Sequence, residues 1–316
     1  MVNIYEEIQI PLKAGNIAGC WYGSRSERPL LALHGWQDNA GTFALLAPIL
    51  SRYTPILAID FPGHGKSSHH PPGIIYHTID YVRAIREIML SFKWSKISLL
   101  GHSMGAAISF HFSSLFPQMV DMLISIDILH TRYFPINAQL YYMRFSTDKF
   151  FMDAERKLSS EHKTPPLYTF EQLQTILYEA SEKSIDFDKT KYILERNITW
   201  SNEHQMYYFC RDNSIKLLQE MNTEPGICIE MAKRLNGIKW LVIKGGDSSH
   251  IDEESAVTKT IKEWHEQNNP NFVFHVLPGL KHHCHLNNPN EVAACILPFL
   301  AKHRVPGRVY TTESKL

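Results

Sequence analysis

The stretch 98-SLLGHSMGAA-107 places Ser103 between two glycines, after an apolar run and before a segment with helical periodicity. A G-x-S-x-G nucleophile elbow requires this context, because its serine sits on a sharp turn from a strand into a helix. Side chains on both sides would crowd such a turn, and Gly101 and Gly105 relieve the crowding. The backbone N–H of Met104 is then available to a developing oxyanion at a helix N-terminus. The stretch predicts a nucleophile at Ser103, and a mere turn residue is the alternative.

Composition narrows the class of protein. The 316 residues carry 32 basic and 32 acidic side chains, which leaves no electrostatic footprint for nucleic acid or an anionic membrane. The five cysteines are scattered without CxxC spacing, which favours reduced thiols over disulfides or a zinc site. The acidic start and the absence of a long apolar run lead us to expect neither secretion nor a membrane span. The balanced charge therefore favours a small or uncharged ligand over a nucleic acid or an anionic membrane.

The last three residues carry a targeting signal. Ser314, Lys315 and Leu316 form the tripeptide that the peroxisomal import receptor reads, at the tip of a polar tail. We expect a peroxisomal protein, and a cytoplasmic one is the alternative.

Short β-branched runs alternate with helical periodicity, which is typical of a mostly parallel sheet with helices on both faces. Eight strands are expected, at 7–12, 17–23, 30–34, 55–60, 96–101, 121–127, 239–245 and 272–279, the first two as an antiparallel pair. Helices are expected near 41–50, 76–92, 104–116, 254–268 and 289–303. The alternation of strand and helix patterns ends after Asp127 and resumes at Lys239. The aromatic-rich segment between them predicts an inserted helical cap. The predicted division is 1–128 core, 129–236 cap, and 237–316 core with a C-terminal tail.

Two further loops support a site around Ser103. The loop in 31-LALHGWQDNAGTF-43 follows the third strand, where a second oxyanion donor is expected, and we assign that donor to the backbone N–H of Trp36. The loop 60-DFPGHGKSS-68 carries glycines and Asp60 at a strand end, and we interpret it as a tight turn that braces the core beneath the site.

The HGW loop, the DxxGxGxS loop and GHSMG, in this order, resemble the α/β-hydrolase fold superfamily. "LHGWQDNAGTF", "GHGKSSHHPPG" and the SKL tail together look most like its serine hydrolase-like (kraken-like) group. The resemblance implies an eight-stranded core and a Ser-acid-His triad in that chain order. It also implies hydrolysis of a carboxyl ester or a related bond.

The general base is expected on the loop after the last strand, where His282, His283 and His285 lie. In the superfamily that the chain resembles, the base usually precedes the proline of the final helix by seven residues. Counting back from Pro289 gives His282, with His285 as the alternative. No HExxH-type motif accompanies these histidines, so neither a metal nor a cofactor is expected.

The acid is expected after the seventh strand, where 242-VIKGGDSSHID-252 supplies Asp247 and, further along, Asp252. Members of the superfamily more often place the acid one or two residues later, where this chain has Ser248 and Ser249. Asp127 is the alternative, because some relatives take the acid from the sixth strand. A cap at the domain junction is the structural interpretation of Asp127.

These residues predict a serine hydrolase that forms an acyl-enzyme on Ser103, with His282 as base and the Trp36 and Met104 amides as oxyanion donors. The aromatic cap suggests a small-molecule substrate, an ester or thioester with an apolar group, although aromatics at helical spacing more often bury the cap's own core. The alternatives are a C–C bond hydrolase or lyase on the same triad and a non-catalytic binding protein.

Overall fold

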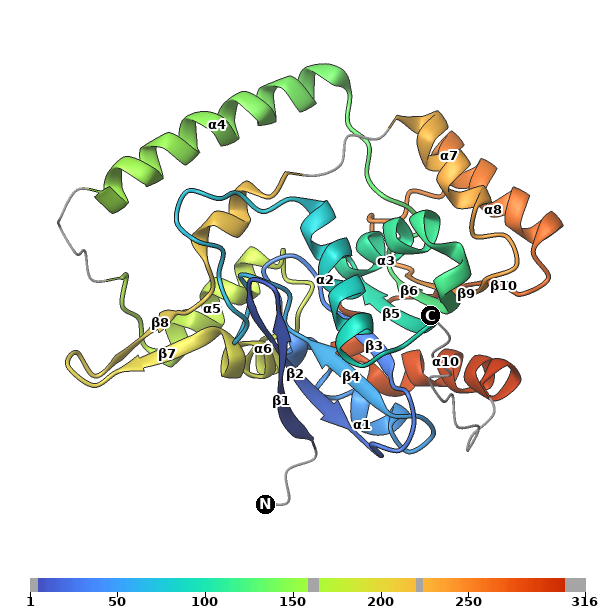
Figure 1. Ribbon diagram of the computed structural model, residues 1–316, viewed down its shortest axis with the longest axis horizontal. Coiled ribbons are helices and arrows are strands. Elements are labelled where there is room, and N and C mark those ends of the chain that lie inside the picture. Colours follow the sequence, from blue (N-terminus) through green and yellow to red (C-terminus); the bar gives the residue numbers. More distant parts are fainter. Residues whose placement is uncertain (1–4, 159–164, 220–223, 305–316) are drawn as a thin grey trace.

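The computed structural model describes residues 5–158, 165–219 and 224–304 (Figure 1). Eight strands form one sheet in the order β1-β2-β4-β3-β5-β6-β9-β10. Their bounds are β1 Glu6–Leu12, β2 Gly15–Tyr22, β3 Leu30–Leu33, β4 Ile56–Ile59, β5 Ile97–His102, β6 Val120–Ile126, β9 Lys239–Gly245 and β10 Phe272–Leu277. Strand β2 pairs antiparallel with β1 and β4, and all other pairs are parallel. The predicted strands and the mostly parallel sheet are confirmed.

Alternating side chains of the strands build a separate core on each face of the sheet. Leu31 and Leu33 of β3 belong to the cluster that includes side chains of α2 and α3. Leu30 and Ala32 belong to the cluster that includes side chains of α1 and α10 on the other face. Because successive side chains of a strand point to opposite faces, fully buried strands appear in the sequence as continuous apolar runs.

The expected core helices are present. They are α1 Ala47–Leu50, α2 Thr78–Ser91, α3 Met104–Leu115, α8 Ala256–Asn268 and α10 Pro289–His303. A 3₁₀ turn, η1 Ala40–Phe43, precedes α1. Two short elements, η2 Pro117–Met119 and α9 Cys284–Asn287, complete the core. Pro289 occupies the first turn of α10, where its missing N–H leaves no acceptor unsatisfied.

In its described parts, the segment between β6 and β9 adds no strand to the main sheet. It contains α4 Ile136–Leu158, α5 Phe170–Ala180, η3 Phe187–Lys189, α6 Thr190–Asn197, η4 Asn213–Leu217 and α7 Pro225–Lys233. It also holds an antiparallel hairpin, β7 Ile198–Ser201 with β8 Met206–Phe209, that a purely helical cap does not include. Helix α4 runs along the outer edge of the molecule, whereas α7 lies beside α8 (Figure 1) and also contacts α3. The predicted division into core and cap stays a prediction.

Two further predictions concern a membrane span and the C-terminal tripeptide. Within the described ranges, no helix combines the length and apolar character that a bilayer crossing needs. Ser314, Lys315 and Leu316 lie outside the described residues, so the peroxisomal address stays a prediction.

Candidate active site

Ser103 occupies the turn between β5 and α3 with φ 52° and ψ −120°. A non-glycine residue in this region of backbone space costs on the order of 1–3 kcal/mol, and such strain concentrates at functional sites. A Cβ on Gly105 would lie 2.1 Å from the Leu33 carbonyl oxygen, and one on Gly101 would lie 2.5 Å from the Ala106 nitrogen. Both glycines are therefore required for the turn that presents Ser103, which is partly exposed.

The loop after β3 passes beside this turn. A Cβ on Gly35 would lie 3.3 Å from the Cβ of Ser103, so the HGW loop borders the serine. Met104 is the first residue of α3, where helix geometry leaves N–H groups without an intrahelical partner. Within the described residues, neither the backbone N–H of Trp36 nor that of Met104 donates a hydrogen bond, whereas the Trp36 indole N–H donates to the Ile215 carbonyl. Both predicted oxyanion donors are thus free to bind a substrate oxygen.

His282, on the loop after β10, meets a carboxylate at the end of β6. Its Nδ1 lies 2.6 Å from Asp127 Oδ2, and both side chains are buried. Asp247 is exposed instead, and its backbone N–H donates to the Leu280 carbonyl. The structure therefore brings Asp127, the alternative acid, to His282, and it does not bring the favoured Asp247 there. The more distant option, Asp252, is also exposed and accepts from the backbone N–H of Glu254.

Three further contacts fix Asp127. Its own N–H donates to the Ile243 carbonyl over 2.7 Å, and φ is 57°. Oδ1 accepts from the Gly245 N–H at 2.9 Å, and Oδ2 also accepts from the Ser248 hydroxyl. Ser248, in the loop after β9, therefore holds a carboxylate that comes from the end of β6.

The base lies in a group of histidines. The His250 ring stacks on the His282 ring with centroids 3.5 Å apart and planes 9° from parallel. The His102 ring lies 4.6 Å from that of His282 and 4.1 Å from that of His285. Burial holds the pKa of His102 well below its usual range and lowers the pKa of His250 to about 4. These neighbours are neutral at pH 7, so His282 works among uncharged imidazoles.

His285, the alternative base, is fully buried. Its Nε2 lies 2.8 Å from the Thr42 hydroxyl, and burial lowers its pKa to about 3. It does not contact Asp127, so the carboxylate orients His282 alone.

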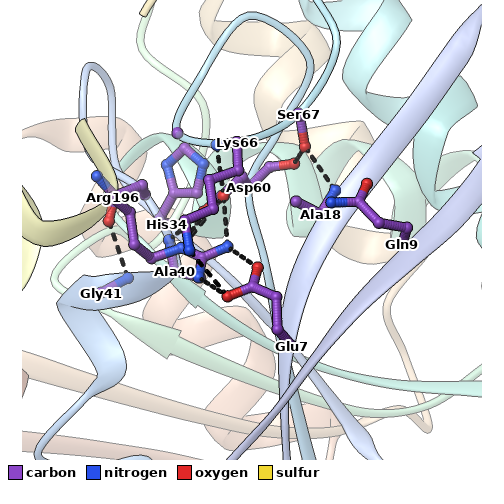
Figure 2. Close-up of polar contacts among 12 residues, drawn as sticks. Glu7, Gln9, Ala18, His34, Ala40, Gly41, Asp60, Lys66, Ser67 and Arg196 are labelled. Atoms are coloured by element: carbon purple, nitrogen blue, oxygen red, sulfur yellow. Dashed lines mark hydrogen bonds and ion pairs between the residues drawn. The ribbon is translucent and has the colours of Figure 1, made fainter. Parts of the chain in front are cut away.

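Asp60 connects the loop after β4 to helix α6 (Figure 2). Its carboxylate accepts from the backbone N–H groups of Ala40 and Lys66. Arg196 of α6 donates to the same carboxylate, with its Nη2 2.7 Å from Oδ2, and also binds both oxygens of Glu7 in β1. These contacts agree with the interpretation of this loop as a brace, and they also fasten α6 to the sheet.

Among the residues that the structure describes, two groups of side chains could hold a metal ion: Asp127 with His250 and His282, and Asp38 with His102 and His283. In the first group the Asp127–His282 contact is already a hydrogen bond. Burial raises the pKa of Asp38 to about 7, against opposing contacts with Thr42 and Asn39.

Comparison with known proteins gives a consistent result. A family model described as alpha/beta hydrolase fold matches residues 28–289. A probable serine hydrolase of Drosophila melanogaster is 33% identical over 299 residues, which cover 94% of this chain and 88% of that protein. A serine hydrolase-like protein of Danio rerio is 31% identical over 301 residues, covering 93% and 88%. The crystal structure of a hypothetical protein of Pseudomonas aeruginosa PAO1 matches with a TM-score of 0.77 and 25% identity, covering 94% and 99% of the two chains.

The chain therefore belongs to the α/β-hydrolase fold family. Within it, the chain is similar to the serine hydrolase-like group, as the sequence motifs predicted, and this similarity supports hydrolase activity in general.

Sequence reasoning missed three residues that shape this site. Ser248 and His250 lie in the quoted loop after β9, but their role depends on a carboxylate from another strand. Arg196 carries no motif, and a lone arginine in a predicted cap gives no signal of its partners.

Proposed function

We propose that this protein is a serine hydrolase that cleaves a carboxyl ester or thioester through an acyl-enzyme on Ser103. The observation that carries the proposal is the 2.6 Å contact between His282 and Asp127, together with a serine held in the elbow conformation. Ser103 is partly exposed on its strained turn and directly follows His102, whose ring lies 4.6 Å from that of His282. A nucleophile and an oriented imidazole are the groups that acyl transfer needs.

The proposed reaction has two halves. The Ser103 hydroxyl oxygen attacks the substrate carbonyl carbon while His282 Nε2 takes the hydroxyl proton. The Trp36 and Met104 N–H groups donate to the oxyanion of the tetrahedral intermediate. The bond to the leaving alcohol or thiol breaks, and His282 returns the proton to it. Water then attacks the acyl-enzyme with His282 again as base, releasing the acid and restoring Ser103.

Asp127 has the role of the triad acid in this proposal. It holds Nδ1 of His282 protonated, which leaves Nε2 free as the base, and it stabilises the imidazolium that forms. The chain order Ser103, Asp127, His282 agrees with the Ser-acid-His order of the family it resembles. A non-catalytic binding role gains no support, because the carboxylate partner is present.

Turnover of a small panel tests the proposal. p-Nitrophenyl esters and acyl-CoA thioesters of increasing chain length are assayed with wild type, Ser103→Ala and His282→Gln. We expect hydrolysis by wild type and at least about 1,000-fold less by either variant. Turnover of a diketone or cyanohydrin without turnover of any ester would favour the C–C bond alternative. Ester turnover that survives Ser103→Ala would contradict the proposal.

A further inference from the structure

Three ligand atoms from separate segments converge beside the elbow. Asp38 Oδ2 comes from the loop after β3, His102 Nδ1 from the end of β5, and His283 Nε2 from the loop after β10. One ligand atom of each residue lies within 4.8 Å of the other two, and Asp38 Oδ2 is 4.0 Å from His283 Nε2. We propose that Asp38, His102 and His283 form a binding site for a transition-metal ion of the Zn²⁺ class, and that the bound ion inhibits Ser103.

Hydrogen bonds fix the tautomer of both histidines. His102 Nε2 lies 3.1 Å from the His282 carbonyl oxygen, which can only accept, so Nε2 carries the proton and Nδ1 a lone pair. The Ser184 hydroxyl donates to the Ser181 carbonyl, so its oxygen accepts from His283 Nδ1 at 2.7 Å. His283 Nε2 therefore carries a lone pair as well.

Two of the three atoms lack a partner. Among the described residues, Asp38 Oδ2 and His102 Nδ1 are buried and make no hydrogen bond. Their side chains are 5% and 0% exposed. Buried polar atoms are almost always paired, so these lone pairs call for a positive centre between them, which is either a shared proton or a bound cation.

The donor set selects the kind of cation. Two imidazole nitrogens and one carboxylate oxygen suit Zn²⁺, Co²⁺ and their neighbours, whereas Mg²⁺ and Ca²⁺ prefer oxygen alone. Metal–ligand bonds of about 2.0–2.2 Å place two ligands of a tetrahedral ion roughly 3.4 Å apart, so the three atoms must close by about 1 Å. The second nitrogen of each histidine already has an oxygen partner, as is usual for metal-bound imidazoles.

The site is reachable, and it touches the reaction centre. His283 is partly exposed and gives an ion a way in. His102 directly precedes Ser103, and His283 directly follows His282. Closing the ligands on an ion shifts both neighbours, and a displacement of about 1 Å of Ser103 or His282 disturbs the alignment that acyl transfer needs. The inhibitory half of this inference rests on the proposed function, whereas metal binding stands without it.

The sequence predicted no metal because no local motif such as HExxH is present. That argument covers only ligands that are close in the chain. These three come from the end of β5 and from the loops after β3 and β10, which the sheet brings together at the carboxyl ends of these strands.

Co²⁺ and Zn²⁺ titration of the chelator-treated full chain tests the site, followed by Co²⁺ visible absorption and calorimetry. We expect one tight site in wild type, weakened at least about 100-fold in Asp38→Asn and in His283→Gln. His69→Gln, which removes an exposed histidine, is the matched control and should bind as wild type does. Thermal unfolding without metal verifies that each variant folds, and the partly exposed His283 provides a second variant if Asp38→Asn does not.

Equal affinity in wild type, Asp38→Asn and His283→Gln would overturn the site. So would loss of binding in His250→Gln alone, because that result assigns the ion to Asp127, His250 and His282. Fluorophosphonate labelling of Ser103 with and without Zn²⁺ tests the second half. We expect saturating Zn²⁺ to slow labelling at least about 100-fold in wild type and less than about 3-fold in His283→Gln. Labelling of wild type that Zn²⁺ leaves unchanged would overturn inhibition, whereas no labelling even without metal would count against the proposed function.

Discussion

His282 Nδ1 lies 2.6 Å from Asp127 Oδ2, although 155 positions separate the two residues in the chain. Strand β9 lies between β6 and β10 in the sheet, so Asp127 after β6 reaches across the end of β9 to His282 after β10. Gly245 at the end of β9 and Ser248 in the loop after it donate hydrogen bonds to the Asp127 carboxylate. The acid and its support therefore come from different strands.

Asp127→Asn should reduce hydrolysis by roughly 10³–10⁴-fold, because an amide in place of a triad acid no longer holds the imidazole in the productive tautomer. Asp247→Asn is the matched control and should stay within about 2-fold of wild type, since Asp247 is exposed. Initial rates on the best ester of the panel measure both. The reverse pattern would return the role of acid to Asp247.

Ser248→Ala should slow turnover by about 10–100-fold with little change in KM. A hydrogen bond to a charged group contributes about 1.5–3 kcal/mol, and here it positions the carboxylate that orients His282. Ser249→Ala removes the neighbouring exposed hydroxyl and should behave as wild type. Equal kcat values for the two variants would rule out this positioning role.

Acidification should destabilise the fold between about pH 6.5 and 4. Burial lowers the pKa of His34 and His285 to about 3 and of His111 and His265 to about 4. As pH falls below about 6.5, these histidines take up protons in the unfolded chain but stay neutral in the folded chain. The free energy of unfolding therefore decreases as pH falls.

Urea unfolding at pH 7, 6 and 5 measures this effect. Each of these histidines should remove roughly 1–2 kcal/mol between pH 7 and 5. His111→Phe should flatten the pH dependence by about one proton, whereas His69→Phe, at an exposed position, should not. An unchanged slope in His111→Phe would show that this histidine is not excluded from protonation.

Arg196→Met should destabilise the protein by about 3–5 kcal/mol. The Arg196 side chain is 2% exposed, and its removal leaves the buried Asp60 carboxylate without its cation. Lys66→Met, at a more exposed cation that also contacts Glu7, should cost less than about 1 kcal/mol. Chemical denaturation compares the two, and similar losses would argue against a buried anchor between cap and core.

Gly105→Ala should cost about 3 kcal/mol or more, because its Cβ would overlap the Leu33 carbonyl oxygen of the sheet. Gly226→Ala in α7, where a Cβ meets nothing within 4 Å, should instead stabilise by about 0.5–1 kcal/mol. Thermal unfolding of both variants separates crowding at the elbow from a general effect of glycine. A neutral Gly105→Ala would contradict the tight elbow.

The sequence predicted the core well because its signals are local. Apolar runs mark the buried strands, and the strand, glycines and helix around Ser103 lie within ten residues of one another. Sequence analysis favoured Asp247 over Asp127 because the correct choice depends on which strands are neighbours in the sheet. The spacing of residues after β9 does not exclude a carboxylate that follows β6. Arg196 and the hairpin β7–β8 were missed because partners far apart in the chain determine them.

Intact mass after incubation with a fluorophosphonate tests the central claim most directly. Wild type should gain one phosphonyl group per chain, mapped by peptide analysis to Ser103. Ser103→Ala should gain none, and Asp127→Asn should be labelled far more slowly than Asp247→Asn. No adduct on folded wild type, or an adduct that persists in Ser103→Ala, would contradict the assignment of Ser103 as the nucleophile.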